Sequence, residues 1–272
     1  MSSRGFERAT VDGVETAYIT SGEGEPLILL HGGESHRGQF DIFRPLLGEG
    51  IHAISYDQRD TGDTRNGPQP YDLARLAEDC AGFAEALGHE RVHVLGASFG
   101  GMIAMHLALR HPGRVASLIL SGTTPSMAMT ENLRDRTTGL GPGEQTQFLL
   151  DLVLTPEGQA ADPELVADTR RALRSRPQDA GARRAAAGQN HDCTGRLAEI
   201  AVPTLVLHGA DDPVIRPTVA EFMAARIPGA RLEILPRTRH GVTFEARRHA
   251  AALVREFVLG HARGSMRGTV QA

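Results

Sequence analysis

The chain of 272 residues contains no lysine, no tryptophan and only two cysteines. Cys80 and Cys193 lie far apart and form no C-x-x-C pattern, so we expect two reduced, structural thiols rather than a disulfide. No apolar run approaches the roughly 18 residues that a membrane-spanning helix needs, and the first residues carry no apolar segment of the signal-peptide type. We therefore expect a soluble, cytoplasmic protein.

The chain also lacks a strong excess of charge of either sign. Its 29 basic residues, all arginine, and its 33 acidic residues give a formal net charge of −4. This balance argues against nucleic acid or a membrane as a partner, and we expect a small-molecule substrate instead. Hydrophobic residues make up 40% of the chain, which is enough for one large domain or for one domain with an insertion. The sequence leaves the oligomeric state open.

Short apolar strands alternate with longer helices over the first 124 residues. Residues 6–20 alternate around Asp12 and Gly13, which predicts an antiparallel hairpin at a sheet edge, and residues 23–26 predict a turn. Wholly apolar strands are typical of parallel sheets that helices cover on both faces. We expect such strands at residues 27–30, 51–56, 92–95 and 115–120, and helices at residues 39–47, 72–87 and 102–109.

This alternation stops after residue 124. The next 70 or so residues contain no buried strand, but helices are expected at residues 144–154, 162–174 and 179–188. Strands return at residues 202–208 and 231–235, with helices at 217–226 and 246–261 and a frayed tail at 263–272. We therefore predict an α/β fold in which a helical cap, residues 125–195, separates two parts of one core, residues 1–124 and 196–272.

A G-x-S-x-G pattern at residues 96–100 lies between a predicted buried strand and a predicted helix. In this context the serine occupies a sharp strand-to-helix turn, with its hydroxyl exposed above the sheet. Glycines are needed on both sides because the turn brings neighbouring backbone too close for side chains. Ser98 is therefore the candidate nucleophile, and it requires a base and an acid elsewhere in the chain.

The carboxyl ends of parallel strands meet at one edge of a sheet, where functional residues collect. His240 follows the last predicted strand and is the candidate base, which takes the proton from Ser98 and returns it to the leaving group. Asp212 follows the preceding predicted strand and is the candidate acid that fixes the tautomer of His240, with Asp211 as its competitor. Residues 121–124 contain no carboxylate, which favours this later position for the acid.

An oxyanion hole needs two backbone N–H groups. Phe99, which follows the candidate nucleophile, is expected to supply one of them. Gly33, which follows a predicted buried strand and His31, is expected to supply the other, with Gly32 and Glu34 as alternatives.

Residues 89–93 match the H-E-x-x-H pattern of zinc enzymes, which requires both histidines on one helical face. Gly88 ends a predicted helix just before this pattern, and the residues after it enter a strand. Positions four apart in a strand are separated by about 13 Å, which is too far to bind one ion. We therefore expect neither a metal nor another cofactor.

The strand followed by His31-Gly32-Gly33, the G-x-S-x-G pattern, the helical insertion and the late aspartate and histidine together resemble the α/β-hydrolase superfamily over about residues 6–262. The resemblance implies an eight-stranded, mostly parallel sheet flanked by helices, with its second strand antiparallel and a cap between strands six and seven. It places Ser98, Asp212 and His240 at the triad positions.

Residues 57–62 are similar to a loop of proline iminopeptidases and of small-capped esterases such as aclacinomycin methylesterase, and Asp60-Thr61-Gly62 is closer to the esterases. Residues 96–101 are also similar to carbon–carbon-bond hydrolases of aromatic degradation, which carry a substrate-binding arginine in the cap; here none of the many cap arginines is singled out. Epoxide hydrolases and haloalkane dehalogenases carry aspartate where this chain has Ser98. Dehalogenases also use tryptophans for halide, which this chain lacks.

These features predict a serine hydrolase that acts on an ester, thioester or lactone of a small, largely apolar molecule. The alternatives are carbon–carbon-bond or amide hydrolysis with the same triad, and a cyclase or small-molecule-binding protein on the same fold. Further pocket residues are expected among Gly32, Glu34, His36, Met127, Met129, His191 and Asp192.

Overall fold

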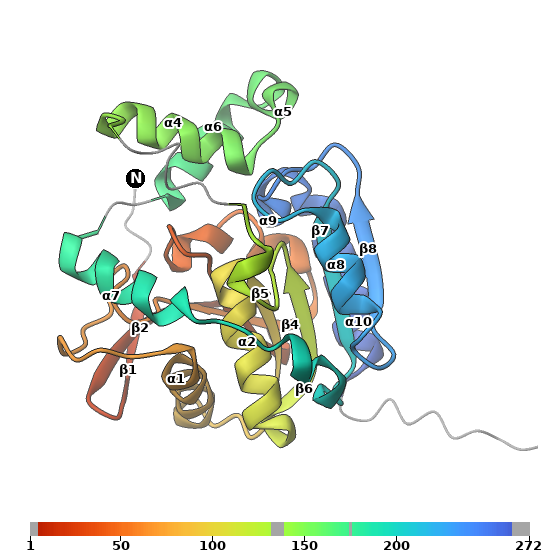
Figure 1. Ribbon diagram of the computed structural model, residues 1–272. Helices are drawn as coiled ribbons and strands as arrows, with labels where there is room; N and C mark the ends of the chain where they lie inside the picture. Colours follow the sequence, from red (N-terminus) through yellow and green to blue (C-terminus); the bar gives the residue numbers. More distant parts are fainter. Residues whose placement is uncertain (1–4, 132–138, 174–175, 263–272) are drawn as a thin grey trace, which may run out of the picture.

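Eight strands form one sheet in the order β1-β2-β4-β3-β5-β6-β7-β8 (Figure 1). The strands are β1 (Glu7–Val11), β2 (Val14–Ser21), β3 (Gly24–Leu30), β4 (Gly50–Tyr56), β5 (Val92–Ala97), β6 (Val115–Ser121), β7 (Thr204–Gly209) and β8 (Arg231–Leu235). β2 runs antiparallel to both β1 and β4, and the remaining neighbours are parallel. This computed structural model describes residues 5–131, 139–173 and 176–262.

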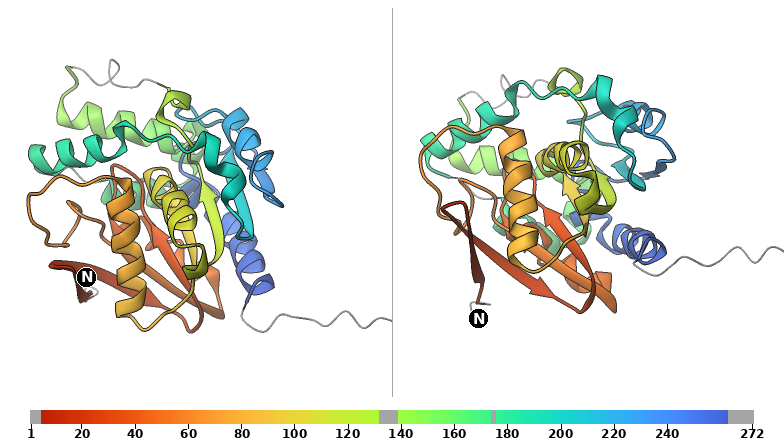
Figure 2. Two further views of the ribbon diagram at one scale, coloured as in Figure 1. Left: turned by 60° about the horizontal axis from the view of Figure 1, so that its bottom comes forward. Right: turned by 90° about the horizontal axis from the view of Figure 1, so that it is seen from below.

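Helices cover both faces of the sheet (Figure 1 and Figure 2). One face packs against α1 (Leu73–Ala86), α2 (Phe99–Arg110) and α8 (Pro217–Ala224), and the other against α10 (Arg247–Gly260) and the 3₁₀ helices η1 (Arg37–Phe40) and η2 (Arg44–Leu47). In β3, Ile28 and Leu30 face the first layer while Leu27 and Leu29 face the second, because successive strand residues point to opposite faces. No helix of the described residues is long and apolar enough to cross a membrane.

A helical segment, called the cap below, is inserted between β6 and β7, and its helices of residues 142–172 lie above the sheet (Figure 1). Its helices are α4 (Pro142–Val153), α5 (Pro156–Ala161), α6 (Pro163–Ala172) and α7 (Gln178–Gln189), with η4 (Met127–Met129) before them and η5 (Thr194–Glu199) after them. The side chains of Thr155 and Asp162 cap α5 and α6 by accepting hydrogen bonds from backbone N–H groups. Leu150, Val153 and Leu165 pack on Phe244 of α9 (Val242–Glu245), which attaches the cap to the core.

The hairpin is confirmed: Asp12 and Gly13 join β1 to β2, and both have positive φ angles, of 47° and 76°. The predicted turn at residues 23–26 is wrong, because β3 already begins at Gly24. The predicted helix at residues 39–47 is also wrong. Two short 3₁₀ helices form there instead, since Pro45 lacks the N–H that would continue an α-helix. The predicted tail at residues 263–272 lies outside the described residues.

Close backbone contacts fix the turn between β5 and α2. A Cβ atom added to Gly96 would overlap the carbonyl of Gly100, and one added to Gly100 would overlap the carbonyl of Leu30 in β3. The start of α2 therefore lies directly against the end of β3. Only glycine allows the helix to approach the sheet so closely.

Replacement of Gly100 with alanine should lower the free energy of unfolding by about 1–3 kcal/mol, because the added methyl group forces two backbone segments apart. Gly113 is the matched control, since a Cβ atom there would meet no atom within 4 Å. Gly113→Ala should leave stability unchanged or slightly higher. Urea unfolding of both variants measures the difference, and equal effects would contradict the close-contact explanation.

Candidate active site

Ser98 lies at the turn between β5 and α2 in a backbone conformation that is uncommon for a residue with a side chain, with φ 51° and ψ −117°. The backbone N–H and carbonyl of Ser98 form hydrogen bonds with β6 and with the residues that follow β6. The Ser98 N–H donates to the carbonyl of Ser121 (2.9 Å), and the Thr123 hydroxyl donates to the carbonyl of Ser98 (2.7 Å). Strained backbone of this kind is found mainly at functional sites, where the surroundings over-determine it.

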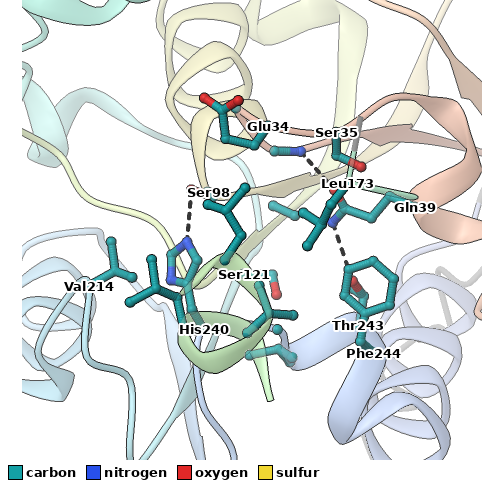
Figure 3. A pocket seen from close by; sticks show the side chains of 18 residues that line it. Glu34, Ser35, Gln39, Ser98, Ser121, Leu173, Val214, His240, Thr243 and Phe244 are labelled. Carbon is teal, nitrogen blue, oxygen red and sulfur yellow. Dashed lines mark hydrogen bonds between the residues drawn. The ribbon is translucent and has the colours of Figure 1, made fainter. Parts of the chain in front are cut away.

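His240 lies in the loop between β8 and α9 and contacts Ser98 (Figure 3) and Asp212. Its Nε2 atom is 2.9 Å from Ser98 Oγ, and its Nδ1 atom is 2.8 Å from Asp212 Oδ2. An ionised carboxylate can only accept hydrogen bonds, so the proton of the neutral ring is on Nδ1. Nε2 is then free to accept the proton of the Ser98 hydroxyl.

Asp212 is buried and surrounded by donors. Its Oδ1 accepts from the N–H groups of Val214 (2.8 Å) and Ile215 (3.0 Å), and its Oδ2 is 3.3 Å from Nε2 of His208. Burial alone would raise the pKa of Asp212, but its interactions with His240 and His208 are stronger and hold that pKa well below its usual value. Asp211 is exposed. The structure thus brings Asp212, and not Asp211, to the histidine.

The histidine loop is tied to the cap. The N–H groups of His240 and Gly241 donate to the carbonyls of Leu152 (3.1 Å) and Val153 (3.0 Å), at the end of α4. One carboxylate, that of Glu245, accepts from the backbone N–H of Thr155 in the cap (2.6 Å) and from that of Arg239 beside the histidine (2.8 Å). The cap therefore takes part in holding His240 in place.

Gly33 and Phe99 lie together on one side of Ser98. A Cβ atom on Gly33 would be 3.8 Å from the Phe99 Cβ. Phe99 is the first residue of α2, so its N–H has no acceptor within the helix. The N–H of Gly32 already donates to Gln39 Oε1 (2.9 Å), which argues against the Gly32 alternative and leaves Gly33 and Glu34 as candidates for the second donor.

Two cavities of unequal size meet at Ser98, and both are lined by Gly33, Glu34 and Val214. The smaller, of about 220 Å³, lies between the core and the cap and is also lined by His240 (Figure 3). Its apolar lining comes from Leu149, Leu152, Val153, Leu173, Val242 and Phe244. The larger, of about 640 Å³, is more polar, and its lining includes Phe99, Met102, Met127, Arg176, Arg184 and Gln189.

Some of the other expected pocket residues line these cavities, and the rest do not. Gly32 lines the smaller cavity and Met127 the larger. His36, Met129, His191 and Asp192 are absent from the described lining of both. His191 instead contacts the carbonyl of Thr124 (3.1 Å) and the ring of His106, and the carboxylate of Asp192 accepts from the N–H of Thr194 (2.9 Å).

Sequence reasoning missed Gln39, Gln58, Arg184 and Glu245, whose polar groups hold the loops around Ser98. No local pattern marks these residues, since each also has a hydrogen-bond partner that is distant in sequence. The two histidines of the H-E-x-x-H pattern do not lie on one helix. His93 is in β5, with its Nδ1 atom 2.7 Å from the Ser117 hydroxyl. His89 follows α1, and its ring packs against the ring of His52.

A family model described as alpha/beta hydrolase fold matches residues 25–246. The chain belongs to this family. It is 31% identical to the pimeloyl-[acyl-carrier protein] methyl ester esterase of Nitrosospira multiformis, over 84% of this chain and 92% of the relative. It is 29% identical to the proline iminopeptidase of Clostridioides difficile, over 84% and 89% of the two chains. A solved hydrolase from Pseudomonas aeruginosa has a TM-score of 0.83 at 29% identity and covers 94% of this chain and 99% of its own. The chain is thus an α/β-hydrolase enzyme.

Replacement of Asp212 with asparagine should cost about 1–3 kcal/mol of stability at pH 7, because it removes a charged acceptor of buried hydrogen bonds. The pKa of Asp212 is lowered in the folded protein, so its carboxylate stabilises the fold above the pKa of the unfolded chain, about 3.9, and this stabilisation is lost as the pH falls further. The difference in the free energy of unfolding between wild type and variant should therefore narrow below about pH 4.

Urea unfolding between pH 7 and pH 3 tests the prediction, with Asp211→Asn as the exposed control that should follow wild type throughout. A difference in the free energy of unfolding between wild type and Asp212→Asn that stays unchanged down to pH 3 would contradict the prediction.

Proposed function

We propose that the protein is a serine hydrolase that cleaves an ester, thioester or lactone of a small, largely apolar molecule through an acyl-enzyme. The observation that carries this proposal is the continuous chain of hydrogen bonds from Asp212 through His240 to Ser98, opening into an apolar cavity. The names of two similar proteins support an ester-like substrate. One is the methyl ester esterase described above, and the other is a solved structure of an N-acyl homoserine lactone degrading enzyme, which is 26% identical with a TM-score of 0.80.

In the proposed reaction, Ser98 Oγ attacks the substrate carbonyl while His240 Nε2 accepts the hydroxyl proton. Asp212 keeps the proton of the ring on Nδ1 and stabilises the cation that forms. The N–H groups of Gly33 and Phe99 bind the oxyanion. His240 then protonates the leaving group and activates a water molecule that releases the acid from Ser98.

The two cavities suggest the shape of the substrate. One arm of the molecule would occupy the smaller, apolar cavity of about 220 Å³, and the other the larger and more polar cavity of about 640 Å³. Both cavities are completed by cap residues, so we take the cap, residues 125–195, as the unit that sets specificity between the two parts of the core, residues 1–124 and 196–272.

Ser98→Ala should abolish both turnover of p-nitrophenyl esters and labelling by a fluorophosphonate, because the attacking oxygen is gone.

Asp212→Asn should lower kcat by about 10⁴-fold, since the ring of His240 then favours the wrong tautomer. Asp211→Asn should stay near wild type, because its side chain is exposed and away from His240. The reverse ranking of the two aspartates would overturn the assignment of the acid. A wild-type protein that is neither labelled nor active would overturn the proposal.

The unequal cavities also predict an asymmetric response to substrate length. Two series of esters, one lengthened on the acyl side and one on the alcohol side, should differ, because only one of the two arms enters the cavity of about 220 Å³. We expect kcat/KM to fall sharply with length in one series and to change little in the other. Two flat series, or two equally sharp declines, would contradict the division into two cavities.

A further inference from the structure

Arg184 is a buried arginine of α7 that forms no ion pair with another described residue. Its hydrogen bonds are with uncharged groups, and the carboxylate of Glu34 is near enough to attract its charge. Nη2 donates to Gln58 Oε1 (2.5 Å) and to the carbonyl of Gly32 (3.4 Å), and Nε donates to the carbonyl of Gly33 (3.2 Å). Burial lowers the pKa of Arg184 to about 10, so the side chain is still protonated at neutral pH. The cap thus places a full positive charge against the loop that contains Gly33.

The contact with the Gly32 carbonyl bears directly on the proposed oxyanion hole. The carbonyl of Gly32 and the N–H of Gly33 belong to the same peptide group, which is planar and trans, so they point in opposite directions. A donor that holds the carbonyl on one side therefore fixes the direction of the N–H on the other. A positively charged donor also polarises the peptide group and strengthens that N–H as a donor.

His31 holds the same carbonyl from a second direction, with Nδ1 2.9 Å from the oxygen. Burial and the nearby charge of Arg184 keep the pKa of His31 well below its usual value, so the ring is neutral and Nδ1–H donates. Two donors thus converge on one oxygen, and one of them comes from the cap.

Arg184 also contacts the second proposed oxyanion residue. Its guanidinium lies over the ring of Phe99, 4.2 Å from the ring centroid. Gly188, one turn further along α7, faces the same ring, and a Cβ atom there would be 3.0 Å from it. One face of α7 therefore holds both Gly33 and Phe99 relative to Ser98.

We propose that Arg184 is a positioning residue for the oxyanion hole, and that the hole is complete only when the cap places the guanidinium of Arg184 against residues 32–33. This inference rests on the proposed serine hydrolase function. The rival role is direct binding of an anionic group of the substrate. Arg184 also lines the larger cavity, and its Nη1 has no hydrogen-bond partner among the described residues. Three hydrogen bonds to core oxygens favour positioning.

The test compares Arg184→Gln and Arg184→Lys with wild type on a neutral p-nitrophenyl ester. Loss of one oxyanion donor costs roughly 10²–10³-fold in kcat, so Arg184→Gln should lower kcat by up to about 10²-fold with KM little changed. Arg184→Lys keeps the charge but loses the planar guanidinium, so its kcat should lie between that of wild type and that of Arg184→Gln. Inhibition by a trifluoromethyl ketone, which forms an oxyanion on Ser98, should weaken by the same factor as kcat/KM.

Arg183→Gln is the matched control. The neighbouring Arg183 pairs with Asp60 and Asp179 and so ties α7 to the core, but it makes none of the contacts with Gly32, Gly33 or Phe99. Its kcat should remain close to wild type. An equal loss in Arg183→Gln would mean that general anchoring of the cap explains the effect, and would overturn the proposal. Urea unfolding of all three variants separates these effects from loss of the fold.

The rival role is tested with an ester that carries a free carboxylate. If Arg184→Gln raises only the KM of this anionic ester and leaves kcat for neutral esters unchanged, Arg184 binds substrate and the positioning proposal fails. Failure of the proposed function is a separate result, since it would appear in the wild-type protein as absent turnover and absent labelling of Ser98.

Discussion

The left-handed backbone at Ser98 is the constraint on which the rest of the site depends. A serine with φ of 51° stays in that conformation only where its neighbours leave it no other. Here the neighbours are β3 and β6: the carbonyl of Leu30 lies against Gly100, and Ser121 and Thr123 hold the serine's own backbone groups. The packing of the sheet thus determines where Oγ points, before any catalytic partner is considered.

The partners of Ser98 come from segments that the core alone does not hold. His240 sits in a loop whose N–H groups donate to the end of α4, and Glu245 joins that loop to Thr155 of the cap. On the opposite side of the serine, Arg184 of α7 contacts the loop of Gly32 and Gly33. The cap therefore encloses the cavities and also contributes hydrogen bonds to both sides of the site.

The strands and the residues that follow them could be predicted, because each short apolar run ends at the same edge of a parallel sheet. Ser98, Asp212 and His240 all stand at such positions, and the structure brings them together. Arg184 could not be found in this way. It is one of 29 arginines, and its partners Gln58 and Gly32 are 126 and 152 positions away along the chain. Local patterns predict helices in the cap, but they do not predict which face of each helix is turned toward Ser98. The sequence therefore could not show that Met127 lines a cavity and Met129 does not.

The bonds between α4 and the histidine loop limit how independently the two parts of the molecule can change. A foreign cap placed on this core would have to supply carbonyls where Leu152 and Val153 accept from His240 and Gly241, and a donor where Arg184 reaches the Gly32 carbonyl. A substitution in α7 that reshapes the larger cavity also changes the contacts of the loop beside Ser98. Under the proposed function, we therefore expect substrate choice and turnover to change together.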